Sequence, residues 1–420
     1  MDYGLIGKKL GHSFSKPIHE QLAGYRYELR ELPTEEEFRA FMREQAFRAI
    51  NVTIPYKRLV MEYCDVVDEQ ARAIGAVNTV VNRAGTLYGY NTDFAGAAWA
   101  LARHGVALAG RTVLILGTGG TRRTLQAVAE SQRAARVLVA GRSGGEGVLT
   151  YAQAARCRDV QVVVNCSPAG MWPACGECLV DLADWPALEA VFDAVYNPLE
   201  TRLLWQARQR GAVAVNGLEM LVAQAKYAAE HFLGRGLPDS AMPEVHRQLC
   251  EQVSSLVLIG MPGCGKTRIG QLAAQLLGKR FVDMDDEVVR RAGMTIPELF
   301  AVRGEAAFRD LESQVAAELG AQGGLVVATG GGAVLRGENV RALRQNGVLV
   351  YLDRPLEQLA VGGGRPLSSS REAVEQLYRR RAPLYAQAAH VRVPNRGGPP
   401  REAADAVCAA YRQAVAGGVF

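Results

Sequence analysis

The chain has 420 residues, of which 49% are hydrophobic and 22% are charged, and its net charge is +5. This length predicts about three domains, and the composition is that of an ordinary soluble globular protein. The charge is mild and no basic block occurs, which disfavours a nucleic-acid-binding protein. No apolar run approaches the roughly 18 residues of a membrane helix.

The N-terminus and the cysteines indicate a cytoplasmic protein. The first nine residues lack the charged and then apolar order of a signal peptide. Eight cysteines in 420 residues are too few for a disulfide scaffold. Four of them lie close together, but their spacing does not fit a zinc ribbon or knuckle, and we favour free thiols over a zinc site. These four are Cys157, Cys166, Cys175 and Cys178.

Up to about residue 93, short apolar runs alternate with helical patterns, which predicts an α/β domain. Residues 49–54 are typical of a strand. Residues 34–45 are typical of a helix that Thr34 caps, with Glu37 in the position of a capping box. This part has no phosphate-binding loop of its own, so we expect it to bind and transform the substrate.

A second α/β unit follows from residue 94 to about 217. Strands are predicted at 112–116 and 136–140, with a glycine turn and a helix to residue 131 between them, which makes a βαβ unit. Further strands are predicted at 160–165, 190–195 and 212–216. The helix predicted at 219–233 is expected to return and pack on the first domain.

The glycine turn of this second unit is an imperfect G-x-G-x-x-G dinucleotide fingerprint. Where the next strand ends, an NAD enzyme places an acidic residue for the ribose hydroxyls, but this chain has Arg142 and Ser143. An arginine and a hydroxyl suit a 2′-phosphate, so the sequence predicts NADP as the cofactor. The residues predicted to bind its pyrophosphate are Gly117, Thr118, Gly119, Gly120 and Thr121.

A second kind of phosphate loop lies at residues 260–267, G-M-P-G-C-G-K-T. It follows the apolar run 256–259 and precedes a helical pattern, as a G-x-x-x-x-G-K-[ST] loop must. Its amides are expected to bind the phosphates of ATP, while Lys266 reaches the β- and γ-phosphates and Thr267 binds Mg²⁺. The expected ATP-binding residues here are Gly263, Cys264, Gly265, Lys266, Thr267 and Arg268.

The phosphate loop does not show which molecule receives the phosphoryl group, so this substrate must be inferred from other residues. Asp283 and Asp285 end a predicted strand, where one carboxylate could lie near the metal and the other accept a hydroxyl proton. The alternative is an acidic helix N-terminus without a catalytic role. Arg309 and Arg381 suit a small carboxylated and hydroxylated acid, because guanidinium groups pair with carboxylates.

The dehydrogenase-like part also carries a possible acid/base pair. Lys57 could give a proton to a carbonyl oxygen as hydride arrives, with Asp93 as its partner. Taken singly, Lys57 is as compatible with a solvated surface lysine, and Asp93 with a helix N-cap.

Five motifs in order remove much of this ambiguity. They are G-H-S-F-S-K-P at 11–17, N-V-T-I-P-Y-K at 51–57, G-A-V-N-T at 75–79, G-Y-N-T-D at 89–93 and G-L-E-M-L-V-A-Q-A at 217–225. Residues 1–250 thereby resemble the shikimate dehydrogenase family. The resemblance implies that Lys57 and Asp93 are the catalytic pair. It further implies substrate contacts for Ser13, Ser15, Thr53, Lys57, Asn78, Asp93, Tyr196 and Gln224, and a nicotinamide contact for Gly217.

Residues 256–410 resemble the shikimate kinase family through the phosphate loop, the carboxylates after the next strand, the glycine turn 330–332 and R-A-P-L-Y at 381–385. The resemblance implies that Asp285 is the base at the 3-hydroxyl and that Asp283 lies near Mg²⁺. Arg309, Gly331 and Arg381 would bind shikimate. Arg365 would be a lid arginine over the phosphates, although the residues before it depart from the family pattern.

The sequence therefore predicts a bifunctional α/β enzyme that reduces 3-dehydroshikimate with NADPH and then phosphorylates shikimate with MgATP. We expect residues 1–252 to form the dehydrogenase region, with the NADP-binding domain at about 94–217, and residues 253–420 to form the kinase domain. One alternative is a catabolic quinate/shikimate dehydrogenase fused to a kinase of another hydroxy acid. Another is that one half is a degenerate binding module. The oligomeric state, possibly a homodimer, stays open.

Overall fold

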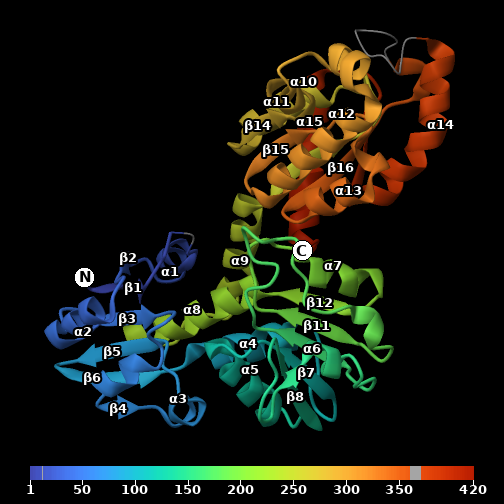
Figure 1. Ribbon diagram of the computed structural model, residues 1–420. Helices are drawn as coiled ribbons and strands as arrows, with labels where there is room; N and C mark the ends of the chain where they lie inside the picture. The colour runs from blue at the N-terminus through green and yellow to red at the C-terminus, as the bar shows by residue number, and fades with distance from the viewer. Residues whose placement is uncertain (12, 360–369) are drawn as a thin grey trace. The chain divides into compact units, whose positions relative to one another are not determined.

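The computed structural model describes residues 1–11, 13–359 and 370–420 (Figure 1). The predicted α/β class is confirmed, because the described strands form three sheets and helices connect them. The chain divides into two compact units. One comprises Met1–Tyr196 and Thr201–His246, and the other comprises Asn197–Glu200 and Arg247–Phe420.

The first sheet of the first unit has the strand order β2-β1-β3-β5-β6-β4. β1 pairs in parallel with β2 and β3, while β5 is antiparallel to β3 and β6. The strands are β1 (Tyr3–Gly7), β2 (Glu28–Glu31), β3 (Ala49–Val52), β4 (Val66–Val67), β5 (Thr79–Arg83) and β6 (Thr86–Tyr90). The helices around them are α1 (Ser15–Ala23), α2 (Glu35–Glu44), η1 (Leu59–Tyr63), α3 (Glu69–Ile74) and α4 (Thr92–Arg103).

The helix predicted at 34–45 is α2, and its predicted capping box is confirmed. Thr34 accepts the amide hydrogen of Glu37 at 3.2 Å, and the Glu37 carboxylate accepts that of Thr34 at 3.0 Å. Its apolar face buries Phe38, Phe41 and Met42 in the core of the first sheet. The helix is thereby fixed both by its cap and by burial of apolar surface.

The second sheet is wholly parallel, in the order β12-β11-β10-β7-β8-β9. Its central strand β7 is buried along its whole length, as a parallel strand covered on both faces requires. The strands are β7 (Thr112–Leu116), β8 (Arg136–Gly141), β9 (Leu149–Thr150), β10 (Val162–Asn165), β11 (Ala190–Asp193) and β12 (Val213–Asn216). The helices are α5 (Gly120–Ser131), α6 (Tyr151–Ala154), η2 (Leu182–Asp184) and α7 (Arg202–Gln209).

Helix α8 (Gly217–Leu233) connects the two sheets of the first unit. It packs along α4 and also contacts α1, β3 and β5, so its predicted return to the first sheet is confirmed (Figure 1). Because α4 leaves the first sheet and α8 returns to it, this helix pair brings residues far apart in sequence to one site.

The second unit has a parallel sheet in the order β14-β15-β13-β16-β17. The strands are β13 (Ser255–Ile259), β14 (Arg280–Asp283), β15 (Leu325–Ala328), β16 (Gly347–Asp353) and β17 (Val391–Pro394). The helices are α10 (Lys266–Leu277), α11 (Met284–Ala292), α12 (Ile296–Ala321), η3 (Ala333–Leu335), α13 (Gly337–Arg344), η4 (Leu356–Gln358), α14 (Arg371–Ala388) and α15 (Pro400–Ala416), while α9 (Ala241–Val253) leads from one unit to the other.

The central position of β13 places the phosphate loop at the carboxyl end of a buried strand. In parallel sheets, ligands bind at this end, where loops from neighbouring strands meet. Within the described part of the chain, no helix combines the length and the apolar character needed to cross a membrane.

Candidate active sites

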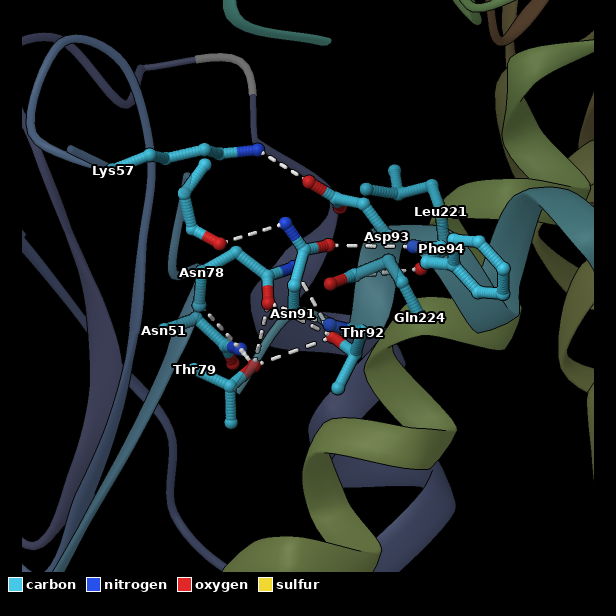
Figure 2. Close-up of polar contacts among 11 residues, drawn as sticks. Asn51, Lys57, Asn78, Thr79, Asn91, Thr92, Asp93, Phe94, Leu221 and Gln224 are labelled. Atoms are coloured by element: carbon cyan, nitrogen blue, oxygen red, sulfur yellow. Dashed lines mark hydrogen bonds and ion pairs between the residues drawn. The ribbon is translucent and has the colours of Figure 1, made fainter. Parts of the chain in front are cut away.

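Lys57 and Asp93 form an ion pair in the first unit. The Lys57 ammonium lies 2.6 Å from a carboxylate oxygen of Asp93, and the two side chains are 21% and 10% exposed (Figure 2). Lys57 lies in the turn after β3, and Asp93 lies in the first turn of α4. The interpretation of Lys57 as a solvated surface lysine is therefore wrong.

The start of α4 explains why Asp93 is available for this pair. Asn91 is the N-cap: its side-chain oxygen accepts the amide hydrogen of Phe94 at 3.3 Å. Its side-chain nitrogen donates to the Ala76 carbonyl at 2.9 Å and so ties the helix to the chain before β5. The alternative interpretation of Asp93 as an N-cap is thus wrong, and its carboxylate faces Lys57.

Two further predicted substrate contacts lie beside this pair (Figure 2). Asn78, directly before β5, is 3% exposed and bonds to both the backbone amide and the hydroxyl of Thr92. Gln224 comes from α8, where its side-chain nitrogen donates to the Leu221 carbonyl at 2.9 Å. Segments from three parts of the sequence therefore meet at one place.

The two predicted carboxylate-binding serines lie at the N-terminus of helix α1, where Ser15 is the first helical residue and Ser13 precedes the N-cap Phe14. The Ser13 hydroxyl lies 3.1 Å from that of Ser15 and accepts the Ser15 amide hydrogen at 3.2 Å. The Phe14 ring between them packs against Tyr196, with 5.6 Å between ring centroids, and burial raises the pKa of Tyr196. Thr53 follows β3 and donates its amide hydrogen to the Ile6 carbonyl at 2.9 Å.

The glycine turn after β7 has the geometry that a dinucleotide loop requires. Gly117 has φ of 109°, and a Cβ there would lie 3.0 Å from the Ser167 amide nitrogen. Gly119 and Gly120 begin α5 with open space where a Cβ would be, so their backbone amides are accessible to an anion. Thr118 and Thr121 complete the turn. These residues fit the pyrophosphate of a dinucleotide.

The remaining predicted NADP residues lie at the ends of neighbouring strands. Arg142 and Ser143 follow β8, and the Arg142 side chain is exposed. Burial raises the pKa of Tyr151, and the positive charge of Arg142 partly opposes this effect, so the two side chains are neighbours. Gly217 follows β12, where a Cβ would lie only 2.2 Å from the Ala194 carbonyl oxygen. A side chain at position 217 would therefore collide with the backbone.

The phosphate loop of the second unit connects β13 to α10. The Lys266 ammonium is buried and donates to the carbonyls of Gly260 and Met261 at 2.9 and 3.0 Å. Gly265 has φ of 99° and is the N-cap of α10. The carbonyl of buried Cys264 accepts a hydrogen bond from the Asn395 side chain at 2.8 Å. Gly263 has a positive φ, and Arg268 is exposed.

A hydroxyl and a carboxylate converge next to this loop and fit a magnesium ion. The Thr267 hydroxyl donates to Asp283 at 2.8 Å, and the other Asp283 oxygen accepts the Asp285 amide hydrogen at 3.0 Å. Oxygen ligands of this kind are those that Mg²⁺ prefers. Burial and the neighbouring Asp283 raise the pKa of Asp285 to about 6.

Arg309 lies on α12 between two glutamates, one of which sequence reasoning missed. Its guanidinium bonds to Glu312 at 2.8 Å and to Glu305 at 3.1 Å, and these partners are 1% and 52% exposed. Burial raises the pKa of Glu312, against the effect of Arg309. The spacing of three residues on one helix was the available signal for this pair.

The glycine turn and α14 complete this site. The Gly331 carbonyl accepts hydrogen bonds from Arg381 at 3.0 Å and from Tyr385 at 2.5 Å. Sequence reasoning assigned Arg381 but gave no role to Tyr385. The predicted lid residue Arg365 lies outside the described residues. In the described ranges, no group of three or more His, Cys, Asp or Glu side chains could hold a metal ion.

Comparisons with known proteins identify two families in this chain. Residues 5–80 match the family described as shikimate dehydrogenase substrate binding domain, and residues 262–412 match shikimate kinase. Shikimate dehydrogenase (NADP(+)) of Symbiobacterium thermophilum is 37% identical over 267 residues, which covers 57% of this chain and 91% of that protein. Shikimate kinase of Nitrosomonas europaea is 42% identical over 144 residues, which covers 33% of this chain and 68% of the kinase.

The chain belongs to the shikimate dehydrogenase family and to the shikimate kinase family. It thus joins an oxidoreductase and a kinase of the shikimate pathway. Solved structures agree for the dehydrogenase part. The chorismate mutase/shikimate 5-dehydrogenase fusion protein of Clostridium acetobutylicum is 33% identical, with a TM-score of 0.56 over 59% of this chain and 96% of that one. Shikimate 5-dehydrogenase of Thermus thermophilus, in complex with NADP(H) and shikimate, is 29% identical, with a TM-score of 0.54 over 59% of this chain and 99% of that one.

Proposed function

We propose that this chain reduces 3-dehydroshikimate to shikimate with NADPH and then transfers the γ-phosphoryl group of MgATP to the 3-hydroxyl of shikimate. One observation carries the proposal: two independent parts of the chain belong to families named for the same acid. The product of the first reaction is the substrate of the second. The division of the chain at residues 252 and 253 and the cytoplasmic location stay predictions.

In the first reaction, Lys57 is the proposed acid. NADPH supplies the hydride when it is bound. The Lys57 ammonium gives a proton to the carbonyl oxygen that becomes a hydroxyl, and Asp93 holds the ammonium in place through the 2.6 Å contact. Ser13 and Ser15 are proposed to bind the substrate carboxylate, because their hydroxyls lie together at the start of α1. Thr53, Asn78, Tyr196 and Gln224 are proposed to contact the rest of the substrate.

In the second reaction, Asp285 is the proposed base. Its carboxylate accepts the proton of the 3-hydroxyl as the oxygen attacks the γ-phosphorus and the bond to the β-phosphate oxygen breaks. Lys266 exchanges its two carbonyl partners for phosphate oxygens. Thr267 and Asp283 would hold Mg²⁺, which neutralises phosphate charge when bound. Arg309, Arg381 and Gly331 are proposed to bind shikimate, with Glu312 holding Arg309 in place.

The reaction sequence is tested with purified full-length protein, 3-dehydroshikimate, NADPH and MgATP. We expect one ADP for each NADPH consumed, and no ADP when NADPH is omitted. Shikimate supplied directly should restore ADP formation without NADPH. If shikimate gave no ADP, the kinase assignment would be wrong. If NADH replaced NADPH without loss of rate, the role of Arg142 and Ser143 would be wrong.

The cofactor loop has its own test in a matched pair of glycine variants. Gly119→Ala places a methyl group in open space and keeps an allowed φ of −73°, so the protein should fold. The methyl group would occupy the space of the pyrophosphate, so KM for NADP⁺ should rise roughly tenfold or more. Gly117→Ala should instead lower the melting temperature, because φ is 109° and Ser167 is close. An unchanged KM in Gly119→Ala would place the dinucleotide elsewhere.

A further inference from the structure

A buried chain of polar side chains lies behind the proposed substrate site, and of its members only Asn78 has a proposed role in the reaction. Tyr27, Asn51, Asn78, Thr79 and Thr92 are all between 0% and 4% exposed. Tyr27 precedes β2, Asn51 lies in β3, Asn78 directly precedes β5, Thr79 begins β5, and Thr92 begins α4. Figure 2 shows Asn51, Asn78, Thr79 and Thr92 with their contacts. Buried polar groups are costly unless they are hydrogen-bonded, so a network of this size must be oriented consistently.

The donors and acceptors of this network can be assigned beginning with the side chain of Asn51. Its side-chain nitrogen lies 3.2 Å from the Asn78 backbone carbonyl, which can only accept, so this atom must be the donor. The Asn51 oxygen therefore accepts from the Tyr27 hydroxyl at 2.7 Å. The Asn51 nitrogen also lies 3.0 Å from the Thr79 hydroxyl oxygen, which accepts its second hydrogen. The Thr79 hydroxyl therefore donates its own proton to an acceptor other than Asn51.

The orientation of the Asn78 carboxamide follows from two of its neighbours. The Thr92 backbone amide can only donate, and it lies 2.8 Å from the Asn78 side-chain oxygen. The Thr79 hydroxyl lies 3.0 Å from the same oxygen and donates to it. The Thr92 hydroxyl lies farther from that oxygen, at 3.3 Å, and also 3.3 Å from the Thr79 hydroxyl. Thr79 is therefore the nearer hydroxyl donor and, with the Thr92 amide, fills both lone pairs of the Asn78 oxygen. The Asn78 nitrogen donates one hydrogen to the Thr92 hydroxyl at 3.1 Å, and its second hydrogen has no partner among the described residues.

We propose that Thr79 is a positioning residue of the dehydrogenase site, which fixes the Asn78 carboxamide so that Asn78 can only donate a hydrogen bond to the substrate. The inference rests on the proposed role of Asn78 in substrate binding. Thr79 touches no substrate, since it is fully buried behind Asn78. Its hydroxyl occupies the one acceptor position on Asn78 that a substrate hydroxyl could otherwise use. The site thereby requires an acceptor oxygen on the substrate at this position.

The test compares two variants of the full chain that differ by one hydroxyl. Thr79→Val keeps the shape of the side chain but removes the donor to Asn78, while Thr79→Ser keeps the donor. In shikimate oxidation, we expect Thr79→Val to raise KM for shikimate roughly fivefold to tenfold, the effect of one hydrogen bond. Its kcat and its KM for NADP⁺ should change less than about twofold. Thr79→Ser should restore the wild-type KM for shikimate within about twofold.

Two Asn78 variants separate this inference from the role on which it rests. Asn78→Asp keeps an acceptor towards Thr79 and Thr92 but loses the free donor, so it should raise KM for shikimate at least as much as Asn78→Ala. Normal KM in Asn78→Ala would contradict the substrate-binding role of Asn78. A defective Asn78→Ala with a normal Thr79→Val would overturn only the positioning role of Thr79. Equal defects in Thr79→Val and Thr79→Ser would indicate packing and would also overturn it.

Discussion

The central lysines of the two proposed sites have different kinds of hydrogen-bond partner. In the dehydrogenase site, Lys57 already lies 2.6 Å from Asp93, the partner with which it is proposed to act. In the kinase site, Lys266 donates to two carbonyls of its own loop and Thr267 donates to Asp283. On the proposed roles, substrate would enter the first site without breaking its central ion pair, whereas phosphate would replace existing partners of Lys266 in the second.

This difference follows from what each reaction needs. A proton transfer needs a donor held at one place, and a buried hydrogen-bonded network supplies that rigidity. A phosphoryl transfer needs strong positive charge that must stay satisfied before ATP arrives, because an unpaired buried cation is costly. On the proposed roles, the contact between Lys57 and Asp93 would therefore persist during the reaction, whereas the contacts of Lys266 with its loop carbonyls would be replaced when ATP binds.

The largest expected effect is the loss of dehydrogenase activity when the ion pair between Lys57 and Asp93 is removed. Lys57→Ala should lower kcat for shikimate oxidation, in which Lys57 would accept the hydroxyl proton, by about 10²- to 10⁴-fold, because general acid–base catalysis contributes roughly that amount. Phosphorylation of shikimate by the same preparation should be unchanged and serves as the control for protein concentration. If the two activities fell together while the protein stayed folded, the sites would not act independently.

Lys266→Ala should lower the kinase activity and leave the dehydrogenase activity unchanged. We expect phosphorylation to fall about 10²- to 10³-fold, the usual effect of losing one stabilising charge in a transition state. Shikimate oxidation should be unaffected. The loop should keep its structure because the two carbonyls can bind water instead, which a melting curve can check. A loss of shikimate oxidation would contradict the separation of the two sites.

The pH dependence of the kinase reports on Asp285. A base must be deprotonated, and the pKa of Asp285 is raised to about 6. The rate of phosphorylation should therefore be at its plateau above pH 7 and fall about tenfold per pH unit below pH 6. Asp286→Asn, at an exposed neighbour, should leave this acidic limb in place, whereas Asp285→Asn should abolish most activity. A flat profile down to pH 5 would argue against Asp285 as the base.

The smallest expected effect is on KM for shikimate, and it distinguishes the two glutamates that contact Arg309. Glu312 is 1% exposed and Glu305 is 52% exposed, although both contact the same guanidinium. Glu312→Gln should raise KM for shikimate roughly tenfold, because Arg309 loses its buried partner and its orientation. Glu305→Gln should change KM less than about twofold, since exposed ion pairs contribute little. Equal effects would mean that exposure does not decide which partner matters.

The two nucleotide loops and most of the proposed kinase-site residues could be named from the sequence because each belongs to a short local pattern, and their roles stay predictions. Residues 260–267 and the turn after β7 are contiguous, and the backbone geometry that they need is encoded by their glycines. Glu312 was missed although it lies three residues from Arg309, because many such pairs on helices have no function. Tyr385 was missed because its partner Gly331 is 54 residues away along the chain.

The amino-acid sequence by itself determined the α/β class, the two families and the order of the two enzymes, because these depend on local periodicity and contiguous motifs. Only the tertiary structure showed how closely the polar side chains approach each other and in which direction each hydrogen bond points. The sequence named Lys57 and Asp93 as a pair, but their 2.6 Å contact and the orientation of Asn78 by Thr79 and Thr92 arise where β3, β5 and α4 meet. The physical reason is that a buried amide or carboxylate is oriented by all its neighbours together, and those neighbours are distant in sequence.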